Sequence, residues 1–206
     1  MSLARLLQLA SPTLPVGAYS YSQGLEAAIE AGAVRDAPSA ERWIADLLEL
    51  SLARLELPLL RRQIDDPTQA RNDFFLATRE TAELRAETLQ MGHSLTRLLG
   101  ELGIPMAIRD PVYPTAYAIA VRAWDIEARA ATIAYLWSWL ENQVMAAVKA
   151  VPLGQTAGQR ILLTLGARLE ALAAAELDEA QWSNFAPGLA ALSARHEMQY
   201  SRLFRS

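Results

Sequence analysis

Lys149 is the residue whose type and setting most suggest chemistry, because it is the single lysine beside eighteen arginines. It lies in an apolar segment, Val-Lys-Ala-Val-Pro, that ends at Pro152. A lysine removed from water can act as a Schiff-base nucleophile or a general base. Alternatively, its ammonium group extends to the carbonyl end of its own helix. The spacing identifies no His, Glu or Tyr partner for catalysis, so we favour a structural or interface role.

The two histidines are the next candidates for acid–base or metal chemistry. His93 follows Gly92 off the apolar positions, which predicts a surface residue. His196 shares a helical stripe with Leu189, Leu192, Tyr200 and Leu203, so we expect a hydrogen-bonded histidine at the margin of a packed face. A pH switch or a metal ligand is the less favoured alternative. Two histidines cannot by themselves form a three-histidine metal site, and the absence of cysteine excludes zinc fingers and iron–sulfur clusters, so we predict no metal and no cofactor.

Two further patterns could bind phosphate or a cation, and both have simpler explanations. Gly154 and Gly158 lie near a helix start, but no phosphate-binding loop motif surrounds them. Asp65 and Asp66 precede Pro67, where an acidic N-cap and a proline at the first helical position favour a helix start. We therefore expect helix capping there, and not an acidic metal cluster that also includes Asp73.

Composition excludes several classes of protein. The chain has 206 residues, of which 52% are hydrophobic, and a net charge of −4. This length suits one domain with a sizeable core, and the mild acidity argues against nucleic-acid binding. The chain has no run of about 18 apolar residues, the length that could span a membrane, and its first residues do not resemble a secretory signal. We therefore expect a cytoplasmic protein.

Good helix formers dominate nearly every segment between the proline and glycine residues. This pattern predicts an all-α fold: a single-domain bundle over residues 1–206 with about eight to ten helices and no substantial sheet. The longest apolar repeat, from Phe74 to Leu98, predicts one continuous helix that begins near Pro67. On it, Arg79 and Glu83 are one turn apart and predict a weak surface ion pair. The other expected helices cover residues 3–10, 22–32, 39–57, 115–124, 127–151, 155–175 and 187–200.

Four blocks of the chain resemble the family of the urease accessory protein UreF. The first covers residues 6–26 and includes Ser-Pro-Thr-Leu-Pro-Val-Gly-Ala-Tyr-Ser. The second is Arg-Glu-Thr-Ala-Glu-Leu-Arg-Ala-Glu at 79–87, followed by Met91-Gly92. The third spans 141–160 around Val-Lys-Ala-Val-Pro-Leu-Gly-Gln, and the fourth is the ending, Arg-His-Glu-Met-Gln-Tyr-Ser-Arg-Leu-Phe-Arg-Ser.

This resemblance implies a non-catalytic, homodimeric, all-α assembly factor. Such proteins join UreD (also called UreH) and the GTPase UreG to deliver nickel into apo-urease. The family's coupling positions correspond to Glu26, Lys149 and Arg202. The C-terminal tail, residues 197–206, is expected to contact UreD and to become ordered on binding. The tail region supplies the remaining candidate residues: His196, Tyr200, Leu203, Phe204 and Arg205.

We expect Leu203 and Phe204 to bury their side chains in a partner groove, and Arg202 and Arg205 to pair with carboxylates across the interface. Two alternatives stay open. One is an all-α enzyme that uses Lys149 as nucleophile or base. The other is a helical adaptor that serves a complex other than urease.

Overall fold

The helical architecture predicted from the sequence is confirmed. A computed structural model describes residues 3–206, and no strand occurs among them. The elements in chain order are α1 (Leu3–Ala10), η1 (Ala18–Ser20), α2 (Leu25–Glu30), α3 (Ala37–Leu47), η2 (Leu48–Glu56), α4 (Leu57–Asp65), α5 (Gln69–Ala77), α6 (Ala82–Glu101), α7 (Tyr113–Ala123), α8 (Ala128–Ala150), α9 (Gln155–Gly166), α10 (Leu169–Ala174), η3 (Glu179–Gln181) and α11 (Pro187–His196).

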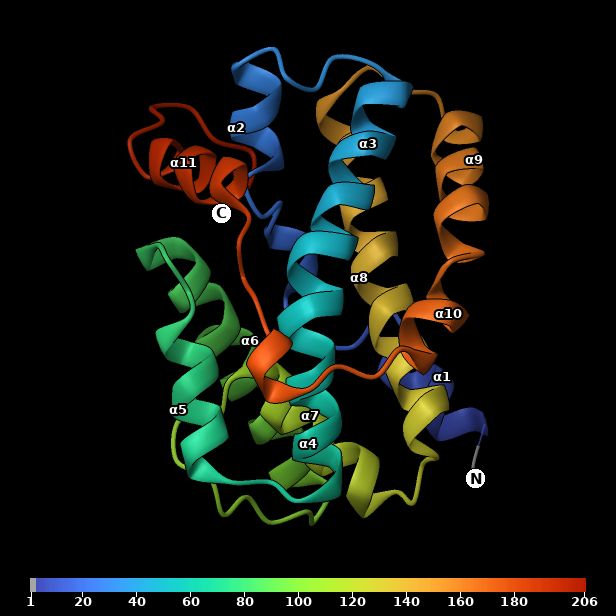
Figure 1. Ribbon diagram of the computed structural model, residues 1–206, viewed down its shortest axis with the longest axis vertical. Helices are drawn as coiled ribbons and strands as arrows, with labels where there is room; N and C mark the ends of the chain where they lie inside the picture. The colour runs from blue at the N-terminus through green and yellow to red at the C-terminus, as the bar shows by residue number, and fades with distance from the viewer. Residues whose placement is uncertain (1–2) are drawn as a thin grey trace.

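The helices α3, α8 and α9 stand side by side, and α4 continues the line of α3 (Figure 1). The short helices α2 and α11 pack together at one end, where the chain also terminates. The segment between α10 and α11 crosses the front of the molecule in the view of Figure 1. The main core includes side chains from most of these helices, and Phe204 of the tail belongs to it.

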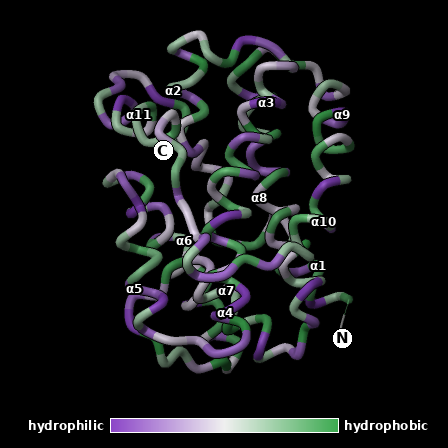
Figure 2. Tube along the Cα trace, in the orientation of Figure 1, coloured by the Kyte–Doolittle hydropathy of each residue, from purple (hydrophilic) through white to green (hydrophobic). Residues whose placement is uncertain are grey.

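Each helix buries one face, and the tube in Figure 2 accordingly alternates between hydrophobic and hydrophilic residues along most helices. The central helix α8 contributes a buried row that includes Leu136, Leu140 and Val144. Within residues 3–206, no helix combines the length and the apolar character that a membrane crossing requires.

Side-chain caps decide where several helices begin. Thr68 and Thr81 each accept a hydrogen bond from a backbone amide three residues later, which starts α5 and α6. Asp36 starts α3 with a capping box. The prediction that Asp66 caps a helix starting at Pro67 was wrong. Asp66 instead ends α4 in an extended conformation.

The continuous helix predicted around Phe74 to Leu98 was also wrong. The chain leaves the helix after Ala77, and Thr81 begins a new one. Thr81 fits the apolar spacing, but its hydroxyl satisfies the Leu84 amide and so acts as a cap. Similarly, the segment predicted at 155–175 forms two helices, α9 and α10.

The helix predicted over residues 39–57 continues through Pro58. Pro58 has no amide to donate, and the Arg54 carbonyl one turn earlier instead accepts a hydrogen bond from the Ser183 amide. The preceding segment η2 has the wider π-helical hydrogen bonding. A long rod of α3, η2 and α4 results, and it places Glu56 opposite α8, where Tyr135 donates to its carboxylate.

Candidate functional site

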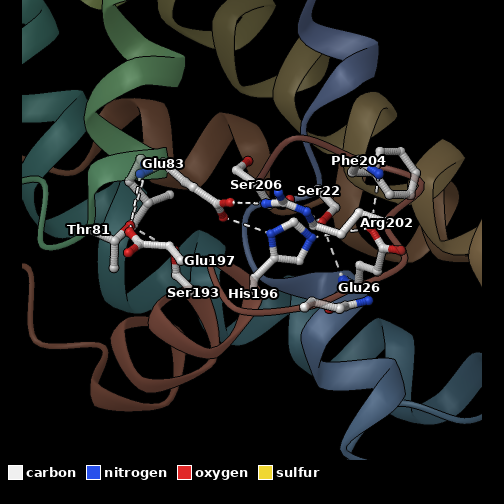
Figure 3. Close-up of polar contacts among 12 residues, drawn as sticks. Ser22, Glu26, Thr81, Glu83, Ser193, His196, Glu197, Arg202, Phe204 and Ser206 are labelled. Carbon is white, nitrogen blue, oxygen red and sulfur yellow. Dashed lines mark hydrogen bonds and ion pairs between the residues drawn. The ribbon is translucent and has the colours of Figure 1, made fainter.

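The C-terminal tail folds back onto α2, and Glu26 holds its backbone (Figure 3). The Glu26 carboxylate accepts hydrogen bonds from the Leu203 amide at 2.7 Å and from the Phe204 amide at 2.9 Å. Glu26 lies in the first turn of α2, where a carboxylate also complements the helix dipole. It is 8% exposed, so these charge-assisted bonds are shielded from solvent.

His196 lies between two carboxylates at the end of α11. Its Nδ1 is 2.7 Å from Glu83 and its Nε2 is 3.3 Å from Glu26. The side chain is fully buried, whereas the sequence predicted a position at the margin of a face. Which of the two ring nitrogens donates depends on the tautomer of the imidazole. His196 thereby links α2, α6 and α11.

Arg202 contacts the same group of residues from the tail. Its guanidinium donates to Glu83 at 2.6 Å. The predicted surface pair between Arg79 and Glu83 was wrong, because Arg79 precedes α6 and Glu83 faces the tail. Arg79 instead lies 3.7 Å from Glu56.

The last residue, Ser206, is anchored on the segment just before α2. Ser22 donates its backbone amide and its hydroxyl to the Ser206 carbonyl. The Ser206 hydroxyl donates to Glu87 of α6 at 2.7 Å, and Gln23 donates to the other Glu87 oxygen at 2.6 Å. The Arg205 amide donates to the Ser20 carbonyl, while its side chain stays exposed.

Phe204 joins the tail to Lys149. The ring is 5% exposed, and the Lys149 ammonium lies 4.8 Å from its centroid in a cation–π contact. The expectation that Phe204 waits for a partner groove was therefore wrong: it is buried in its own chain. Leu203, by contrast, is 57% exposed. Alternation along an extended tail turns one side chain inward and its neighbour outward.

Tyr200 does not share the stripe predicted for His196. Because α11 ends at His196, the helical spacing does not continue, and Tyr200 is fully exposed. Met198 is 87% exposed as well. Leu203 is the third exposed large side chain of the tail, and we call Met198, Tyr200 and Leu203 together the tail surface. An apolar surface held by ordered backbone is suited to binding another protein.

A small cavity lies next to the anchored tail. Its volume is about 60 Å³. It is lined by residues from several helices: Ala18, Gln23, Glu56, Phe75, Arg79, Leu84, Glu87, Thr88, Met91, Tyr113, Tyr135, Ser138, Trp139 and Asn142. Burial raises the pKa of Glu87 to about 7, although hydrogen bonds from Gln23 and Ser206 oppose the shift. Tyr135 donates its hydroxyl to Glu56, and burial raises the pKa of Tyr135 well above its ordinary value.

The other candidate residues do not join this site. His93 is exposed and lies 3.4 Å from Asp110. Gly154 is the N-cap of α9, which confirms the predicted helix start, and Gly158 lies within that helix and packs against Val148. Among residues 3–206, no group of three or more His, Asp or Glu side chains is placed to hold a metal ion.

Sequence reasoning identified Glu26, Lys149, His196 and the tail, but it missed the residues that fix them in place. Glu83 and Glu87 lie in the second family-like block, so the resemblance marked the segment without indicating the tail as its contact. Ser22 lies in the first block, four residues before Glu26, and its hydroxyl accepts a hydrogen bond from the Glu26 amide.

Comparisons with known proteins agree with the blocks. The sequence profile of the UreF family matches residues 34–166. The chain is 60% identical to the urease accessory protein UreF of Azoarcus sp. (strain BH72), over all of this chain and 96% of the relative. It is 53% identical to that of Dechloromonas aromatica (strain RCB), over all of this chain and 98% of the relative. The chain therefore belongs to the family of the urease accessory protein UreF.

Proposed function

We propose that this protein is a non-catalytic scaffold that joins UreD (UreH) and the GTPase UreG in the cytoplasm, so that nickel enters apo-urease. One observation carries the proposal. The three coupling positions suggested by the resemblance meet at the tail. Glu26 accepts from the Leu203 and Phe204 amides, and the Lys149 ammonium lies over the Phe204 ring. Arg202 belongs to the same tail segment.

The tail surface is the proposed contact with UreD. Met198, Tyr200 and Leu203 expose apolar area. Glu26 holds the tail backbone through the Leu203 amide, and Glu83 holds the Arg202 side chain. A surface that is already ordered loses less conformational entropy on binding than a disordered segment does. We therefore propose that UreD binds a preformed tail, in place of the disorder-to-order transition expected from the sequence.

Co-expression with UreD and UreG tests the assignment. The full chain should co-purify with both, and urease activity should depend on its presence. Deletion of residues 197–206 also removes Phe204 from the main core, so it should abolish capture of UreD and lower the melting temperature, while circular dichroism below that temperature still reports a helical protein. If the truncated chain captures UreD fully, the tail is not the docking site.

Arg202→Ala tests the tail in a finer way. It should reduce urease activation without loss of helicity, because it removes the cation paired with Glu83. Arg97→Ala is the matched control, since Arg97 is an exposed arginine with its own acidic neighbour, Glu101. Equal activation by both variants would reject a coupling role for Arg202.

Lys149 separates the scaffold from the enzyme alternative. Lys149→Arg keeps a cation over the Phe204 ring and should retain activation, whereas Lys149→Ala should reduce it. A Schiff-base enzyme would lose its reaction in both variants, because arginine cannot replace the lysine amine. Borohydride trapping of a carbonyl substrate on Lys149 would support the enzyme and contradict the scaffold.

We also propose a homodimer, as the family resemblance implies. Exposed aromatic side chains, Phe74 at 46% and Trp137 at 37%, leave apolar area on α5 and α8. Light scattering at micromolar concentration should report twice the 22.6 kDa chain mass. A mass that stays at one chain would reject the homodimer.

A further inference from the structure

Arg79 is a largely buried arginine with more hydrogen-bond donors than the acceptors around it satisfy. Its side chain is 9% exposed and lines the cavity beside the tail. The guanidinium stacks over the Phe75 ring, 4.3 Å from the centroid, and its Nη1 is 3.7 Å from Glu56. The stack fixes the plane of the guanidinium group.

The opposite edge of this guanidinium, formed by Nε and Nη2, has no hydrogen-bond partner within residues 3–206. A buried donor without a partner is costly, and two on one side chain are rarer still. Nε and Nη2 point in parallel, the arrangement in which arginine grips a carboxylate through both oxygens. The unmet need is therefore for an acceptor with two oxygens in one plane.

The acidic residues of the cavity do not meet this need. Glu56 accepts from the Tyr135 hydroxyl and faces Nη1, and Glu87 accepts from Gln23 and Ser206. Their carboxylates are already supplied with donors, while the edge of Arg79 is not. This imbalance favours an incoming anion over an incoming cation.

We infer that the cavity binds a small planar oxyanion of the carboxylate class, held through both oxygens by the Nε–Nη2 edge of Arg79. Roughly 10–15 Å³ of such space admits one water molecule, so about 60 Å³ accommodates a ligand of a few non-hydrogen atoms. Tyr113 also lines the cavity. Burial raises the pKa of Tyr113, so its hydroxyl stays protonated and able to donate.

Formate is the probe that tests the site, because it is the smallest carboxylate. It is titrated into the ¹⁵N-labelled full chain at constant ionic strength, with chloride as the replaced anion. The Arg79 Nε–H signal and the Trp139 indole signal should shift together and saturate, because both side chains line the cavity. Chloride alone should give no saturable shift, and trimethylacetate, which is too bulky, should bind at least tenfold more weakly.

Arg79→Lys tests the two-oxygen grip, since it keeps the charge but removes the parallel donors. We expect formate affinity to fall at least tenfold, while Arg97→Lys at an exposed position leaves it unchanged. Equal affinity in Arg79→Lys, or a shift of the Arg79 signal that never saturates, would overturn the inference. Should Arg79→Lys fail to fold, the signals of the unmodified chain still decide.

Discussion

The Glu26 carboxylate and the Phe204 amide are 2.9 Å apart, although 178 residues separate them along the chain. This contact joins the first family-like block to the last. Because the same carboxylate also accepts from Leu203 and faces His196, one side chain holds three groups of the C-terminal region. Glu26 therefore determines the path of the tail.

Glu26→Gln should loosen the tail without unfolding the helices. The amide that replaces one oxygen brings a donor against the backbone donors of Leu203 and Phe204. Hydrogen bonds to a charged group contribute about 1.5–3 kcal/mol, so the tail amides should exchange with deuterium about 10- to 100-fold faster. Hydrogen-exchange mass spectrometry measures this. Glu30→Gln, at an exposed position of the same helix, should leave tail exchange unchanged.

Phe204→Ala should destabilise the whole protein, because the ring is part of the main core. We expect a loss of about 2–4 kcal/mol, from the cavity left behind and the lost cation–π contact with Lys149. Leu203→Ala is the matched neighbour and should cost less than about 1 kcal/mol, since Leu203 is mostly exposed. Urea unfolding compares the two. Equal losses would mean that the tail does not pack as described.

Local patterns predicted those parts of the fold that depend on local physics. The helix at residues 3–10 was predicted within its observed bounds because its apolar repeat ends at Ser11-Pro12. The prediction that Thr81 lies inside a helix was wrong, because a threonine at an apolar spacing can either pack in a helix or cap one. Only the hydrogen bond that it accepts from the Leu84 amide distinguishes the two.

The site was predictable as a set of segments but not as a set of contacts. His196 shows the reason: its partners Glu26 and Glu83 lie 170 and 113 residues away, and no spacing rule connects such positions. The family resemblance indicated Glu26 and Lys149, but it carried no geometry. That Phe204 turns inward became evident only from the packing of the tail on α2 and α8.

Glu87 should make stability depend on pH. The pKa of Glu87 is about 7 in the folded chain and 4.5 in an ordinary glutamate, so the folded protein binds this proton more tightly than the unfolded chain does. The contribution of Glu87 to the free energy of unfolding is fully present below about pH 4.5. It is lost as the pH rises to about 7, by up to about 1.4 kcal/mol per pH unit. Urea unfolding of Glu87→Gln at pH 5, 6, 7 and 8 should show this slope removed. An unchanged pH dependence would contradict the raised pKa of the buried Glu87 carboxyl group.

Gly92 allows α6 to lie close to the chain just before α7. A Cβ at this position would lie 1.9 Å from the Pro111 carbonyl oxygen, so α6 can meet the start of α7 only without a side chain. Gly92→Ala must displace backbone and should cost about 2–4 kcal/mol. At Gly100 on the same helix, a Cβ would meet no atom within 4 Å, so Gly100→Ala should stabilise the chain by up to about 1 kcal/mol. Thermal unfolding should therefore move in opposite directions for the two variants, and a common direction would contradict the close approach of α6 and α7.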